Sequence, residues 1–217
     1  MNRIKSLDPP HKGLRNALSQ LTLQAGKTSF TNRESVAKFQ ALAKEVFHLL
    51  KDHTHTENKF ILAPLEEKLN GSSVEYLDDH KEIDELEAEL LEVIMSLDGT
   101  QSDEEGHDFY LDLCDFQALY LIHIDKEDVE LEPLVQEQFT DEELMGHQVA
   151  IMQEMSFETL LLWFKYIVPA RRTEENAQVL RGFKGAAPKE AFDAAMAVIK
   201  NELDEMEYQR LVEMIGW

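Results

Sequence analysis

Apolar residues recur every three or four positions along most of this chain, and no stretch alternates convincingly between apolar and polar residues. A repeat near 3.6 residues is typical of amphipathic helices, whereas a half-buried strand has a repeat of two. The pattern therefore predicts an all-α protein. Four long helices are expected in the first part of the chain, over about residues 9–24, 33–69, 73–97 and 108–138.

Turn residues separate the predicted helices. Asn32 is expected to cap the second helix, and Pro64 is expected to kink or loosen its last turns. Shorter helices follow, over about residues 140–154, 156–167, 173–184, 188–202 and 204–214. We therefore predict an up-down-up-down four-helix bundle in residues 1–138 and a helical C-terminal extension in residues 139–217.

The apolar face of each long helix is interrupted by a histidine. In the fourth helix the inward positions lead to His123 and Glu127. In the second helix they lead to His53 and Glu57. The first and third helices each carry a histidine on the face of their leucine and isoleucine residues, and the third has an aspartate one turn further on. The candidate site residues are His11, His53, Glu57, His80, Asp84, His123 and Glu127.

Polar side chains at these positions are costly to bury without partners. A lone buried polar group costs about 1–3 kcal/mol, and an unpaired buried carboxylate costs more. Hydrogen bonds among the imidazoles and carboxylates satisfy part of this need, so a buried polar network without metal is one interpretation. A metal ion satisfies all the groups together, because residues at i and i+4 differ by only about 40° around a helix. We therefore predict a metal site inside the bundle.

The two His-x-x-x-Glu motifs form an internal repeat. The segments HTHTENKFILAP and HIDKEDVELEP each continue with apolar residues and then a proline. This suggests two helix pairs related by a pseudo-twofold axis, each with two histidines and one carboxylate. In an antiparallel bundle His80 and His123 are expected at one level, whereas His11 and His53 fit less tightly.

This ordered set of motifs resembles the hemerythrin-like (HHE cation-binding) domain family over about residues 8–135. The resemblance implies a non-haem di-iron centre, with two iron ions bridged by oxygen or hydroxide. It also implies that Glu57 and Glu127 bridge the ions. The implied pairs of histidines, one pair on each iron, are His11 with His53 and His80 with His123.

The third helix departs from the oxygen-carrying members of that family. Those members have His-x-x-x-His, and here the second position is Asp84. An anionic oxygen ligand favours ferric iron, which weakens the case for reversible carriage of dioxygen and favours sensing, oxidation or iron handling. In the alternative interpretation, Asp84 faces solvent and leaves the position to water.

Other polar residues near the motifs are assigned different roles. On an undistorted helix Asp128 is turned about 140° away from His123, so Glu127 is preferred as the ligand. His55 is expected on the solvent face, and His147 on a helix surface or in packing. The competing Glu-x-x-His pattern of ferritin-like bundles lies off the core face and is rejected; its two copies are Glu45–His48 and Glu104–His107.

Composition narrows the possible partners and the compartment. The chain of 217 residues has a formal net charge of −22, which disfavours nucleic acid and anionic membranes. Its single cysteine, Cys114, suits a reducing cytoplasm, and the N-terminal sequence lacks the apolar core of a signal peptide. Aromatic residues of the extension, such as Phe157 and Trp163, suggest packing or an interface with a second copy or a protein partner.

These observations predict a cytoplasmic di-iron protein. We expect it to bind or sense dioxygen or a related small oxidant, such as a diatomic molecule or peroxide, without turnover. One alternative is an oxidase or an enzyme that consumes peroxide or nitric oxide. Another is an iron donor or store. No positioned acid, base or substrate pocket is apparent, which disfavours an enzyme with an organic substrate.

Overall fold

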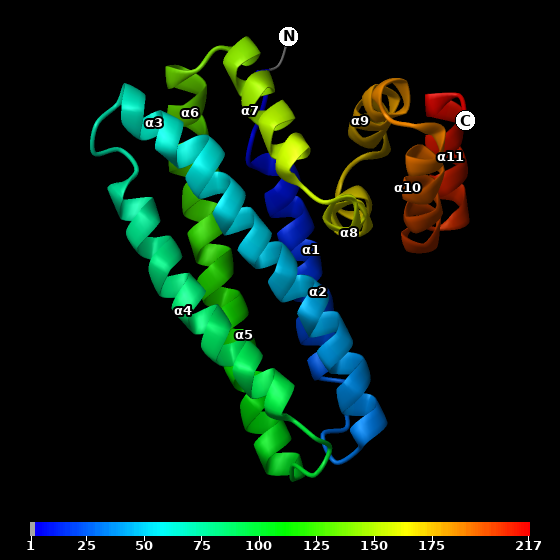
Figure 1. The fold of residues 1–217 in the computed structure, drawn as a ribbon. Helices are drawn as coiled ribbons and strands as arrows, with labels where there is room; N and C mark the ends of the chain where they lie inside the picture. The colour runs from blue at the N-terminus through cyan, green and yellow to red at the C-terminus, as the bar shows by residue number, and fades with distance from the viewer. Residues whose placement is uncertain (1–2) are drawn as a thin grey trace. The chain divides into compact units, whose positions relative to one another are not determined.

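The computed structural model describes residues 3–217, and over this range it contains helices and no strand (Figure 1). The predicted all-α class is therefore confirmed. The chain forms two compact units. The first contains the residues up to Asp8 and Ala17–Glu154, and the second contains Pro9–Asn16 and Met155–Trp217. The units do not follow the predicted division at residue 138, and that domain boundary stays a prediction.

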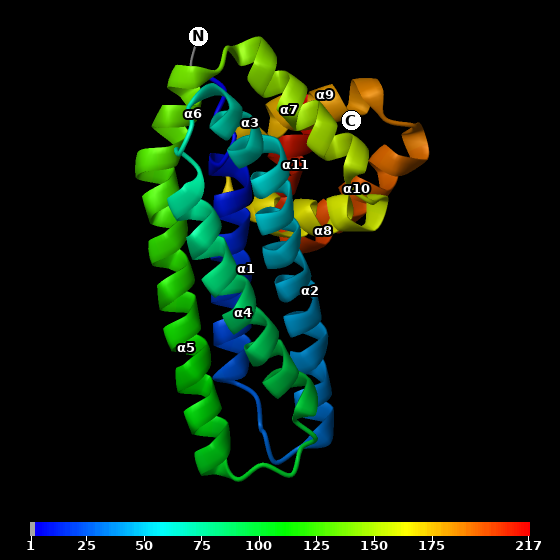
Figure 2. The same ribbon diagram turned by 60° about the vertical axis from the view of Figure 1, so that its left-hand side comes forward.

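The long helices of the first unit lie close to the predicted positions. Three of them lie wholly in this unit: α2 (Arg33–Glu57), α4 (Val74–Ser96) and α5 (Asp103–Lys126). Helix α1 spans Asp8–Ala25, and its part from Ala17 onward belongs to this unit. Asn32 caps α2, as predicted, by accepting a hydrogen bond from the backbone N–H of Ser35. Figures 1 and 2 show α2, α4 and α5 running side by side.

The predicted start of the fourth helix at residue 108 is wrong, because α5 begins at Asp103. The Ser102 side chain accepts from the backbone N–H of Glu105, and the Glu105 carboxylate accepts from the backbone N–H of Ser102. This reciprocal pair satisfies two backbone donors that a helix start otherwise leaves free. The acidic residues before position 108 therefore form the first turn of the helix.

Contacts between the long helices of the first unit are antiparallel. The Gln40 amide, near the start of α2, donates to the carbonyls of Ile94 and Leu97 at the end of α4, at 2.9 and 2.8 Å. The Lys126 ammonium, at the end of α5, lies 2.9 Å from the Asp79 carboxylate near the start of α4. These contacts keep the end of each helix beside the start of its neighbour.

A wide π-helical turn follows each His-x-x-x-Glu motif. Segment η1, Asn58–Leu62, joins α2 to α3, Ala63–Lys68, and η2, Glu127–Leu131, joins α5 to α6, Glu132–Gln138. Pro64 and Pro133 are each the second residue after these turns. Proline lacks an N–H and clashes with the carbonyl four residues earlier, and the wider turn accommodates it. The loosening predicted at Pro64 takes this form, and both carboxylates of the motifs lie at α/π junctions.

Glu132 holds the chain at the start of α1. Its carboxylate is buried and accepts from the backbone N–H of Leu7 at 2.7 Å and of Ser6 at 3.3 Å. We expect Glu132→Ala to lower the free energy of unfolding by about 2 kcal/mol, because it removes a hydrogen bond to a charged acceptor and leaves a buried donor. Urea unfolding measures this loss. Glu130→Ala, at an exposed position on the same turn, should change it little; an equal loss in both variants would contradict the capping role.

Helix α7, Asp141–Glu154, completes the first unit, and the second unit is built from short helices. These are α8, Phe157–Ile167, η3, Val168–Ala170, α9, Thr173–Ala186, α10, Lys189–Glu202, and α11, Glu205–Ile215. Phe164, Leu180 and Phe192 belong to the core of this unit. Within the described residues, no helix is both long enough and apolar enough to cross a bilayer.

Candidate metal centre

The imidazole and carboxylate side chains predicted on the inward faces are buried. Helix α2 carries His53 and ends at Glu57, whereas α5 carries His123 and Glu127 opens η2. The i, i+4 spacing places each pair on one side of its helix. At most 7% of any of these residues is exposed, and the buried set is His11, His53, Glu57, His80, His123 and Glu127.

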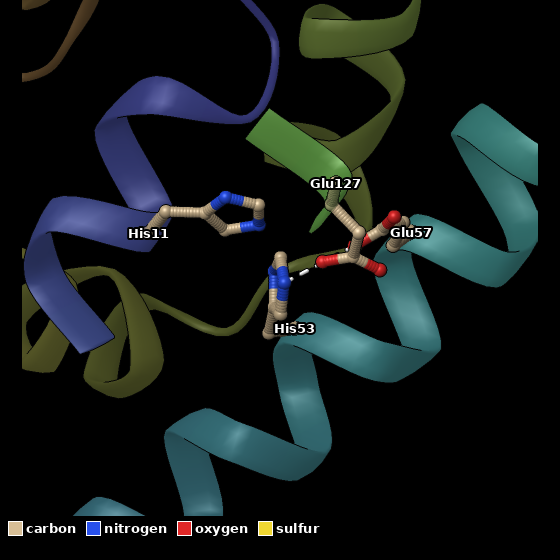
Figure 3. A group of neighbouring side chains, drawn as sticks. All are labelled: His11, His53, Glu57 and Glu127. Carbon is tan, nitrogen blue, oxygen red and sulfur yellow. Dashed lines mark ion pairs between the residues drawn. The ribbon is translucent and has the colours of Figure 1, made fainter. Parts of the chain in front are cut away.

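The side chains gather into two overlapping groups. His11, His53, Glu57 and Glu127 offer ligand atoms that all lie within 4.8 Å of one another, as do the ligand atoms of His80, His123 and Glu127. Figure 3 shows the rings of His11 and His53 directed toward the two carboxylates. Glu127 belongs to both groups, as a bridging carboxylate would. The histidines divide into the predicted pairs, while their role as metal ligands stays a prediction.

Glu127 is ionised because two imidazoles face it. His80 Nε2 and His123 Nε2 each lie 3.1 Å from its Oε1. Burial acts to raise the pKa of Glu127, but hydrogen bonds from His123 and His80 oppose burial and hold the pKa well below its usual range. A carboxylate that is negative in the protein interior is suited to bind a cation.

The burial and the contacts of Glu57 indicate whether these residues fit a metal ion. Only 1% of it is exposed, His53 Nε2 lies 3.1 Å from its Oε2, and neither carboxylate oxygen accepts a hydrogen bond within the described residues. A buried carboxylate in this state is costly unless a cation neutralises it. Imidazole nitrogens and carboxylate oxygens are also ligands that iron, manganese and zinc accept. The donor set therefore fits a metal ion.

The structure does not bring Asp84 to the cluster. Asp84 is exposed and lies outside both groups. The inward positions of α4 after His80 are Ile83 and Glu87, three and seven residues further on. The helix therefore faces the core along a line that passes beside Asp84. A role of Asp84 as a metal ligand stays a prediction, and the exposure of Asp84 agrees with the solvent-facing alternative.

Glu87 is a buried acid that the sequence analysis missed. Only 6% of it is exposed, and burial, together with the nearby charge of Asp84, raises its pKa to about 8. Tyr120 is also buried, and burial and the charge of Glu87 raise its pKa. Glu87 Oε1 and the Tyr120 hydroxyl make no hydrogen bond within the described residues. The four-residue spacing of Glu87 from Ile83 is the sequence signal that places it on the inward face.

Asn58 is a second residue that the sequence analysis missed, and it has no sequence signal. Its Oδ1 lies 2.6 Å from His80 Nδ1. It directly follows Glu57 and is the first residue of η1. The contact joins residues 22 positions apart and depends on how η1 packs against α4, so a helical period could not predict it.

The other candidates lie outside both groups. His55 is exposed, as expected, and its Nε2 lies 2.8 Å from the Glu154 carboxylate on α7. The ring of His147 packs edge-on against Phe139 with centroids 4.9 Å apart, which agrees with a packing role. Asp128 is half-buried. The residues of the two Glu-x-x-His copies, Glu45, His48, Glu104 and His107, belong to neither group.

A helical chain with buried histidines and carboxylates in overlapping groups belongs to the class of metal-binding helical proteins. The family model of the hemerythrin HHE cation binding domain matches residues 2–135, which include both groups. The chain belongs to this family, and the resemblance seen in its motifs is confirmed. No curated protein and no solved structure was found to match the chain.

Proposed function

We propose that this chain is a non-haem di-iron protein that binds or senses dioxygen or a related small oxidant. In this proposal α1, α2, α4 and α5 form an up-down-up-down bundle around two iron ions bridged by oxygen or hydroxide. Cation binding follows from membership of the family. The identity and number of the ions and the oxidant are the proposal, as is a reducing cytoplasmic setting, which the single cysteine suits.

One observation carries the proposal: two groups of buried ligand-type residues share the carboxylate of Glu127. A carboxylate has two oxygens and four lone-pair positions, so it can serve two cations at once. A single-ion site needs no second set of histidines. The pairs His11 with His53 and His80 with His123 therefore support two adjacent ions rather than one.

The protein residues would hold the ions and keep bulk water away. Iron bound here would supply reversible one-electron chemistry and an open position for a small ligand. His53 and Glu57 hold their positions through one turn of α2, and His123 and Glu127 through one turn of α5. Buried neighbours, including Leu50 and Ile124, surround these turns with hydrocarbon.

Metal analysis and an absorption spectrum of freshly purified protein test the proposal. Two iron ions per chain are expected, and a chain purified with no more than trace metal would contradict it. Anaerobic reduction and exposure to air then distinguish the possible activities. A stable, reversible adduct supports binding or sensing. Irreversible oxidation with turnover would identify an enzyme, and rapid loss of iron to a chelator would identify a donor.

A further inference from the structure

His80 and His123 approach the same oxygen of Glu127, but their outer ring nitrogens differ. His80 Nδ1 lies 2.6 Å from Asn58 Oδ1, whereas His123 Nδ1 is buried and makes no hydrogen bond within the described residues. Asn58 opens the wide turn η1, directly after His53 and Glu57 of α2. The turn thus brings the Asn58 side chain to His80, a candidate ligand on α4.

The orientation of the Asn58 amide fixes which nitrogen of His80 carries hydrogen. An amide oxygen only accepts hydrogen bonds, so Nδ1 of His80 donates. In a neutral imidazole the other nitrogen then presents a lone pair. This lone pair faces the Glu127 carboxylate across the 3.1 Å between Nε2 and Oε1. Two electron-rich atoms at this separation require a cation between them. Without metal this cation is the proton of the His80–Glu127 hydrogen bond, and a metal ion would take its place.

We propose that Asn58 is a positioning residue, which holds His80 in the Nδ1–H tautomer and aims Nε2 at the metal position shared with His123 and Glu127. This inference rests on the proposed function only for the metal. The hydrogen bond and the tautomer are properties of the protein alone. Partners of this kind orient metal-binding histidines and strengthen them as ligands.

The amide of Asn58 is a weaker hydrogen-bond acceptor than a carboxylate at the same position would be. A carboxylate accepts more strongly and makes the imidazole a stronger donor to the metal. At the corresponding place in the second motif, directly after Glu127, the chain has Asp128. Asn58 and Asp128 therefore break the pseudo-twofold symmetry of the motifs with a neutral side chain in one half and an acid in the other.

Two replacements of Asn58 separate its positioning role from a merely structural one. Asn58→Leu removes the acceptor at similar size, and Asn58→Asp keeps an acceptor. Nitrogen NMR of the metal-free protein at pH 8 reports which ring nitrogen of His80 carries hydrogen. Titration with Zn²⁺, a diamagnetic probe, reports the affinity of each metal position.

In wild type and in Asn58→Asp, Nδ1 of His80 is expected to carry the hydrogen. In Asn58→Leu the hydrogen should move to Nε2, and the dissociation constant of the Zn²⁺ bound by His80, His123 and Glu127 should rise about 10- to 100-fold. Asn58→Asp should bind Zn²⁺ at least as tightly as wild type. Lys59→Leu is the matched control, since Lys59 lies on the same turn with half of its side chain exposed, and it should leave both readouts unchanged.

An unchanged tautomer in Asn58→Leu would overturn the inference, as would an equal loss of affinity in Asn58→Asp and Asn58→Leu. These outcomes differ from a failure of the proposed function. A wild-type chain that binds no metal would contradict the di-iron proposal, yet the tautomer measurement on the metal-free protein would still decide the role of Asn58.

Discussion

Replacement of Glu127 by alanine is expected to remove both of the proposed metal ions from the protein. Glu127 is the one residue that belongs to both groups of ligand atoms within the described chain. Its loss also leaves His80 and His123 without the oxygen that both face at 3.1 Å. Metal content should fall from two ions to almost none. With free metal at about a thousand times its dissociation constant, the accompanying loss of ligand-dependent stability is about 4 kcal/mol for each ion.

Two further replacements make the test specific. Glu57 lies only in the group with His11 and His53. Glu57→Ala should therefore retain one metal ion, whereas loss of both ions would support the bridging role that the family resemblance implies for it. His55→Ala, on the exposed side of the same helix, should keep both ions. Metal analysis and thermal unfolding with and without metal measure these effects. Full metal content in Glu127→Ala would contradict a shared carboxylate.

Glu87 is expected to make the protein less stable as pH rises from about 4.5 to about 8. Burial raises the pKa of Glu87 from 4.5 to about 8, so in this window the folded protein keeps a proton that the unfolded chain releases. The unfolding free energy therefore falls with pH until the folded carboxyl also ionises. At about 1.4 kcal/mol per pH unit, the full effect is at most about 5 kcal/mol.

Comparison of wild type with Glu87→Gln isolates this effect. The variant has no titrating group at this position, so its stability should fall less between pH 5 and pH 9. The charges of Asp84 and Lys51 act on Glu87, and Asp84 is exposed, so Asp84→Asn is the control that should retain most of the wild-type slope. Urea unfolding of the metal-free proteins at both pH values measures the difference. Equal slopes in wild type and Glu87→Gln would show that Glu87 is solvated.

The residues that could be predicted from sequence are those fixed by one helix at a time. His53 with Glu57 and His123 with Glu127 are each one helical turn apart, and apolar neighbours at the same period mark that side as inward. The proline after the first motif pointed to a local disturbance, which the structure places in η1, and an equivalent turn, η2, precedes the proline after the second motif. The start of α5 was also encoded locally, in the Ser102 and Glu105 capping pair, and was overlooked.

Residues that depend on the rotation and level of neighbouring helices could not be predicted in this way. Asp84 and Glu87 lie on the same helix, and whether one or the other turns inward depends on how α4 packs against α2 and α5. The contact of Asn58 with His80 likewise needs η1 and α4 to lie at one level. Helix propensity and hydrophobic period carry no information about the rotation of a helix or its level relative to its neighbours.

The sequence by itself determined the helical class, the inward histidines and the family, because helix formation and amphipathic spacing are local properties of the chain. Only the tertiary structure decided that Glu127 is common to both groups of histidines and that Asp84 is left outside them. The physical reason is that ligand atoms on separate helices come within a few ångströms only when side-chain packing fixes the rotation and height of each helix.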